Sequence, residues 1–191
     1  TDNNDEAVVL GNSATASYKR LYFDSDGNRL DIESDQNGQM AHAPVTQDTN
    51  WHHYAITMVG EGSGSTATTV IYEDGAAVTT TNDNFGVSDN KDFTVNRIGS
   101  DSSTGGTKEF KGLLYQIAIF NAALDADAVA AVYNSGTPIS LEENKGNYDN
   151  SSDLIQLWNF DEGSGSSTAD GVGGLTGTFN NDVAFSSTTP S

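Results

Sequence analysis

The strongest constraint on the fold is the repeated alternation of short strand-like segments with clusters of Gly, Asp, Asn and Ser. Short strands separated by turn residues at this spacing are typical of all-β proteins. The sequence therefore predicts an all-β fold, a two-sheet antiparallel β-sandwich with one short helix. The expected strands cover residues 18–23, 29–33, 51–59, 68–72, 93–98, 113–120 and 154–160.

Two Asp-Gly pairs predict tight hairpin turns. Asp26-Gly27 and Asp74-Gly75 each lie between strand-like runs. Asp and Gly both tolerate the positive φ that two-residue hairpin turns require. We therefore expect a hairpin at each pair.

The only predicted helix covers residues 125–133. Asp125 can cap its first turn, and Gly136 with Pro138 ends it. The following segment, residues 140–152, is polar and lacks strand periodicity. We expect this segment to be an exposed connection with Tyr148 facing solvent. An exposed Tyr148 is a candidate for stacking on a sugar, but a solitary surface tyrosine is the favoured interpretation.

Acidic residues dominate the charge of the chain. Asp and Glu number 27 against 8 Lys and Arg, which gives a formal net charge of −19. Such a surface repels phosphate backbones, so we expect no nucleic-acid partner. No apolar run is long enough to span a bilayer, so we expect no membrane insertion. The acidity has two open interpretations, which are cation-binding loops and a solvated surface.

The chain contains, in order, the segments Asn50 to Thr57, Val70 to Gly75, Arg97 to Gly99, Phe110 to Leu113, Ile119 to Leu124, Val132 to Gly136 and Leu157 to Gly165. This series resembles the laminin-G-like, concanavalin A-like jelly-roll family. The resemblance covers residues 18–185 and implies that residues 1–191 form a single jelly-roll domain. Family members usually carry an additional upstream strand, so we expect an incomplete N-terminal edge here.

Oxygen ligands gather around the first predicted turn and suggest a cation site. Carboxylate and amide oxygens are the ligands that calcium prefers. The alternative is a hairpin turn whose polar residues face solvent, and the spacing differs from that of an EF-hand loop. The resemblance favours calcium, because related sandwiches often hold Ca²⁺ in rim loops. The predicted metal ligands are Asp24, Asp26, Asn28 and Asp31.

Alternating carboxylates at Asp31, Glu33 and Asp35 would project from one face of a strand. A retaining glycoside hydrolase needs two carboxyl groups about 5–5.5 Å apart. Retaining β-glucanases of the same overall architecture use alternating carboxylates in this way, but their motif begins and ends with Glu. Here the order is Asp-x-Glu-x-Asp. We therefore interpret this strand as an exposed acidic face and predict no catalytic residue.

The histidines suggest structural roles. His52 and His53 are neighbours in a predicted strand, so their side chains should point to opposite faces. His42 has no catalytic partner visible in the sequence. Trp51 and Trp158 lie within apolar runs, which favours packing in the core.

The resemblance implies three alternative functions. The first is a non-catalytic recognition or adhesion module whose rim loops bind a glycan or peptide on a cell surface. The second is a structural or host-attachment component of a virion or surface fibre, which would bind copies of itself or other structural proteins. The third, a glycoside hydrolase acting through residues 31–35, is the least supported. All three imply an extracellular, cell-surface or virion-surface location.

Overall fold

The structure is a computed structural model that describes residues 6–12, 19–24, 28–33, 40–59, 68–83, 96–100 and 108–190. Contacts within the chain divide it into two units. The first unit comprises residues 1–50, 54–73 and 77–111, and the second comprises residues 51–53, 74–76 and 112–191. Each unit has a buried apolar cluster of its own.

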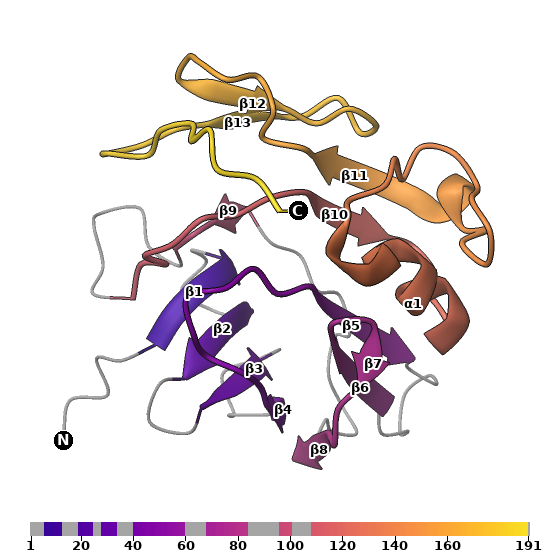
Figure 1. The fold of residues 1–191 in the computed structure, drawn as a ribbon. Coiled ribbons are helices and arrows are strands. Elements are labelled where there is room, and N and C mark those ends of the chain that lie inside the picture. The colour runs from indigo at the N-terminus through magenta and orange to yellow at the C-terminus, as the bar shows by residue number, and fades with distance from the viewer. Residues whose placement is uncertain are drawn as a thin grey trace, which may run out of the picture. The chain divides into compact units, whose positions relative to one another are not determined.

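The first unit contains the larger sheet, in which every neighbouring pair of strands is antiparallel. Its strand order is β8-β4-β3-β2-β1-β9, and β1 to β4 lie side by side in Figure 1. The strands are β1 (Glu6–Gly11), β2 (Arg20–Asp24), β3 (Arg29–Glu33), β4 (Met40–Pro44), β8 (Thr81–Asp83) and β9 (Arg97–Ile98).

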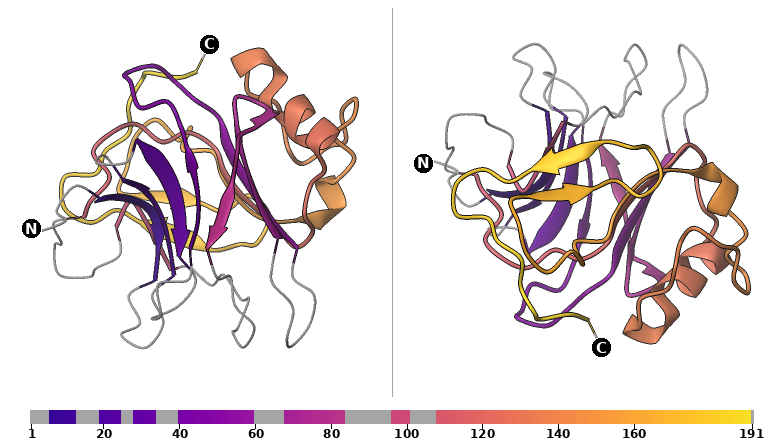
Figure 2. Two further views of the ribbon diagram at one scale, coloured as in Figure 1. Left: turned by 90° about the horizontal axis from the view of Figure 1, so that it is seen from below. Right: turned by 90° about the horizontal axis from the view of Figure 1, so that it is seen from above.

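A second sheet has the order β5-β6-β7. Its strands are β5 (Tyr54–Val59), β6 (Thr68–Glu73) and β7 (Ala76–Ala77). Figure 2 shows β1 to β4 and β5 to β6 as separate layers. Leu30, Ile32 and Ala41 of the larger sheet and Ile71 of β6 belong to one buried apolar cluster. Two sheets that share a core form a sandwich, so the predicted antiparallel β-sandwich is confirmed.

The second unit contains two antiparallel two-stranded sheets, β10-β11 and β12-β13, and the helix. Its apolar cluster includes Leu154 and Leu157 of β11. Asp125 caps the helix, because its Oδ1 accepts a hydrogen bond from the backbone N–H of Ala128 at 2.8 Å, so the predicted helix is confirmed. The elements are β10 (Ile117–Phe120), α1 (Ala126–Tyr133), the 3-10 turns η1 (Asn134–Gly136) and η2 (Ser151–Asp153), β11 (Leu154–Trp158), β12 (Ser167–Ala169) and β13 (Thr176–Thr178).

The connection at residues 140–152 differs from the prediction. Tyr148 is 0% exposed, so the expected solvent-facing ring is wrong. Its hydroxyl donates to the carbonyl of Leu141 at 2.7 Å, and its ring meets Phe120 edge to face. The backbones of Lys145 and Tyr148 bond to each other in both directions. This polar segment therefore satisfies its own backbone locally and buries its aromatic side chain.

The strand predictions hold best where turn residues mark both ends. Strand β3 has the predicted bounds, whereas β5 and β10 begin later than predicted, at Tyr54 and Ile117. Gln116 has a φ of 52°, a left-handed conformation that a strand cannot contain. Residues 93–95 of one predicted strand and the Asp26-Gly27 turn lie outside the described residues. Strands β1, β4, β7, β8, β12 and β13 were not predicted from the sequence.

Asp170 organises the loop between β12 and β13. Its Oδ1 accepts the backbone N–H groups of Leu157, Val172 and Gly173 at 2.8, 3.0 and 2.9 Å. Burial alone would raise the pKa of this carboxyl, but these donors hold it below its usual value. One ionised carboxylate thus fixes the loop to the end of β11.

The predicted hairpin turn at Asp74 and Gly75 is confirmed. Both residues have positive φ, at 49° and 78°, and the turn joins β6 to β7. A Cβ atom added at Gly75 would lie 2.8 Å from Cδ1 of Tyr133. Glycine is therefore required here by its backbone conformation and by the close approach of the last residue of α1.

We expect Gly75→Ala to lower the free energy of unfolding by about 2 kcal/mol, because it adds a steric clash to the cost of positive φ. Gly99 is the matched control, since its φ is 79° and no atom lies within 4 Å of the position that a Cβ would occupy there. Gly99→Ala should cost only about 1 kcal/mol. Urea unfolding of the two variants measures the difference. Equal losses would contradict the close approach of Tyr133.

Candidate functional site

One face of β2 and β3 carries only polar and charged side chains, and we call it the polar face. Alternation along each strand sends the apolar neighbours of these residues to the core. The ladder places Arg20 opposite Glu33, Tyr22 opposite Asp31, and Asp24 opposite Arg29. The polar face consists of Arg20, Tyr22, Asp24, Arg29, Asp31 and Glu33.

Arg29 brings two of the predicted calcium ligands together. Its Nη2 lies 3.0 Å from Oδ2 of Asp24, and its Nε lies 3.0 Å from Oδ2 of Asp31. The Asp31 side chain is 0% exposed. Burial raises the pKa of Asp31 to about 6, although Arg29 acts to lower it. One guanidinium thus supplies positive charge to both carboxylates.

The other two predicted ligands are not brought into this ion pair. Asn28 is exposed, with a φ of 46° at the start of β3. Asp26 lies outside the described residues. A calcium ion bound by Asp24 and Asp31 would share these carboxylates with the cationic Arg29, which competes with the ion for the same oxygens. The calcium site therefore stays a prediction.

Arg20 forms a second charged network at the other end of the polar face. Its Nη1 lies 2.7 Å from Oε2 of Glu6 on β1, and its Nε lies 3.0 Å from Oε2 of Glu33 on β3. Lys108 also binds Oε2 of Glu6, at 2.7 Å. The guanidinium carbon of Arg20 is 4.9 Å from the centre of the Tyr22 ring, a distance at which a cation is attracted to an aromatic face.

The prediction of an exposed acidic strand face is wrong. Asp31 is 0% exposed and Glu33 is 9% exposed, and Asp35 lies outside the described residues. These carboxylates can be buried because each one is paired with a guanidinium on the same face. The ion pair between Arg29 and Asp31 could have been predicted from the sequence, since residues two apart on one strand project from the same face.

His42 also has a place on this side of the sheet. It lies opposite Asp31 in the ladder between β3 and β4, and its charge acts to lower the pKa of Asp31. No partner for His42 was visible in the sequence because β4 was not predicted. His42 and Asp31 are thus neighbours in the sheet, although no local sequence pattern indicates that their two strands pair.

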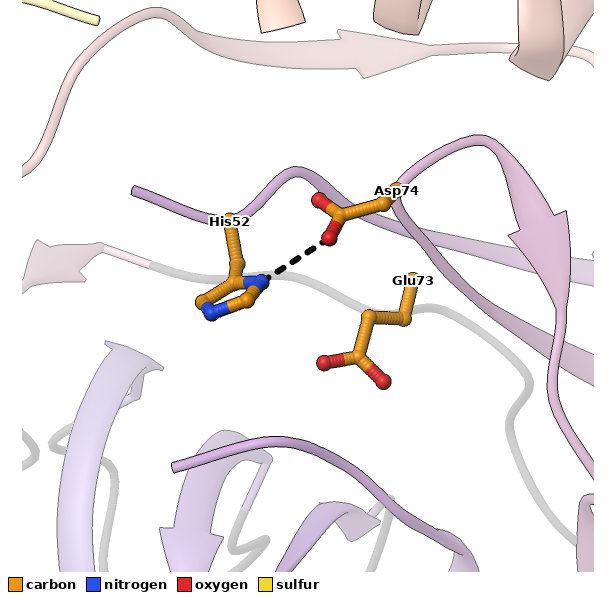
Figure 3. Close-up of side chains that lie close together, drawn as sticks. All are labelled: His52, Glu73 and Asp74. Atoms are coloured by element: carbon orange, nitrogen blue, oxygen red, sulfur yellow. Dashed lines mark hydrogen bonds and ion pairs between the residues drawn. The ribbon is translucent and has the colours of Figure 1, made fainter. Parts of the chain in front are cut away.

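The predicted placement of His52 and His53 within a strand is wrong, because β5 begins at Tyr54. Both residues bind Asp74 instead. Nδ1 of His52 lies 2.9 Å from Oδ2 of Asp74, and the backbone N–H of His53 donates to Oδ1 of Asp74 at 2.9 Å. Figure 3 shows the His52–Asp74 bond and labels Glu73, the residue before Asp74. The two histidines fix the turn.

The two tryptophans differ in burial. Trp158 is 8% exposed, which confirms the prediction of a core position. Trp51 is only partly buried.

We expect Arg20→Met to lower the free energy of unfolding by about 3 kcal/mol, because it leaves the carboxylates of Glu6 and Glu33 without their shared cation. Lys111→Met is the matched control, since it removes the same charge from an exposed side chain. Urea unfolding at one ionic strength measures both variants. A loss for Arg20→Met no larger than that for Lys111→Met would contradict a stabilising role of the network.

Comparison with known proteins gives one family match. The family model, described as the concanavalin A-like lectin/glucanases superfamily and of the laminin G type, matches residues 1–130. No curated protein and no solved structure was found to match the chain. Among the described residues, no helix is long and apolar enough to cross a membrane. The matched range includes β1, which was not predicted from the sequence.

Proposed function

Because the chain belongs to the concanavalin A-like lectin/glucanase superfamily, we propose that it is a non-catalytic recognition module that binds a glycan or a peptide on a cell surface. Members of such a fold share a rigid sandwich and differ in the loops that join its strands. The proposal places the binding groups in the rim loops and the protein outside the cell. The family match supports this placement.

The burial of Asp31 and Glu33 is the observation that supports a non-catalytic role. A glycoside hydrolase needs a general acid and a second carboxylate that both reach the scissile bond. Here Asp31 is 0% exposed and binds Arg29, while Glu33 is 9% exposed and binds Arg20. Carboxylates held in this way support the sheet rather than attack a substrate.

We further propose that calcium organises the rim at the β2–β3 turn, with Asp24, Asp26, Asn28 and Asp31 as ligands. Asn28 supports this part of the proposal, because its exposed side chain lies at the start of β3 beside the turn. Calcium sites of extracellular modules bind at about 10⁻⁴–10⁻³ M. Binding in this range would stabilise the folded state by mass action.

After treatment with a chelator, we expect calcium at about ten times such a dissociation constant to raise the melting temperature by several degrees. Asp24→Asn should abolish the increase. Asp161→Asn is the matched control, since it changes the charge equally at an exposed position and should leave the increase intact. A melting temperature that does not respond to calcium would remove the ion from the proposal without affecting the recognition role.

Glycan and peptide arrays test the recognition role directly. We expect the wild-type chain to bind a restricted set of array ligands, and Arg20→Lys, a change on the polar face away from the proposed rim, to keep that selectivity. Incubation of candidate polysaccharides with the protein should release no reducing sugar. Two blank arrays would contradict recognition and favour assembly with structural proteins, whereas released sugar would contradict the non-catalytic role.

A further inference from the structure

The backbone of His53 is fixed to the Asp74-Gly75 turn on both sides. Its N–H donates to Oδ1 of Asp74 at 2.9 Å, and its carbonyl accepts from the N–H of Asp74 at 2.8 Å. The main chain of His53 is therefore held against the turn.

The same turn meets the last residue of α1. The rings of His53 and Tyr133 have centroids 5.9 Å apart and an interplanar angle of 32°. Gly75 extends this contact, because Cδ1 of Tyr133 lies 2.8 Å from the position that a Cβ would occupy there. His53 and Gly75 together form the surface on which the end of α1 rests.

The His53 ring is suited to this contact only in its neutral form. Its Nδ1 is shielded from solvent and has no hydrogen-bond partner among the described residues. A neutral imidazole can carry its proton on the other nitrogen, whereas the charged ring must carry one on both. Protonation would thus place an unpaired donor and a charge in a shielded position, which is unfavourable.

The neighbouring charges offset the unfavourable protonation of the His53 ring only in part. Burial lowers the pKa of His53 below its ordinary value, although the negative charge of Asp74 acts to raise it. The Asp74 side chain is 35% exposed, so water screens its attraction. The helix contributes the Tyr133 ring and no basic residue in its last turn. His52, the other ring on the turn, binds Asp74 and would bind it more strongly when charged.

We propose that His53 is an acid-sensitive latch that holds the end of α1 on the Asp74-Gly75 turn at neutral pH and releases it on acidification. The docked state disfavours the extra proton and the released state accepts it, so protons bind preferentially to the released state. The docking free energy is therefore complete above the ordinary histidine pKa and is lost as the pH falls below it. The latch is independent of the proposed recognition function.

Hydrogen exchange of peptides from residues 126–136 tests the latch. After correction for intrinsic rates, we expect protection to fall by at least about threefold between about pH 7.5 and about pH 5. His53→Gln should remove this pH response, because glutamine does not titrate. His52→Gln is the matched control and should retain the response. Equal responses in the wild type and His53→Gln would overturn the proposal.

An NMR titration of the wild-type protein keeps the test decisive if His53→Gln does not fold. We expect the His53 ring to titrate below the ordinary midpoint of about 6.5, and the amide signals of residues 126–136 to shift with the same midpoint. A His53 midpoint at or above the ordinary value, or α1 signals that do not follow it, would overturn the latch.

Discussion

Arg20 connects three neighbouring strands of the larger sheet, and much of the first unit depends on this connection. It binds Glu6 of β1 and Glu33 of β3 from its own position on β2. A slip of one residue in either ladder would turn Arg20 toward the apolar core and Leu21 toward the polar face. The ion pairs and the core therefore specify the same register, although one acts through charge and the other through burial of apolar surface.

This register decides which chemistry the polar face can support. Arg20 and Arg29 bring positive charge to the carboxylates of Glu33 and Asp31, which would otherwise be buried and uncompensated. A chain with net charge −19 thus uses two of its few arginines to neutralise carboxylates on one sheet.

The sequence was sufficient for features set by local chemistry. The Asp74-Gly75 turn, the Asp125 cap and the bounds of β3 all follow from residues within a few positions of one another. It was not sufficient for β1 or β4, although Gly11-Asn12 lies at the end of β1 and Asn37-Gly38 precedes β4, because each strand is stabilised by pairing with another strand. Without β4, His42 had no visible partner, although it lies opposite Asp31.

Tyr148 and His53 show why polarity alone misplaces side chains. Tyr148 lies in a polar segment but is fully buried, because its hydroxyl binds Leu141 and the surrounding backbone closes on itself. His53 was expected to follow strand alternation, but its backbone N–H binds the carboxylate of Asp74 and the strand begins only after it. In both cases one hydrogen-bond acceptor, the Leu141 carbonyl or the Asp74 carboxylate, places the residue differently from what polarity or strand alternation predicts. A satisfied polar group can enter the interior at little cost, so the burial of Tyr148 follows its hydrogen-bond partner as much as its hydrophobicity.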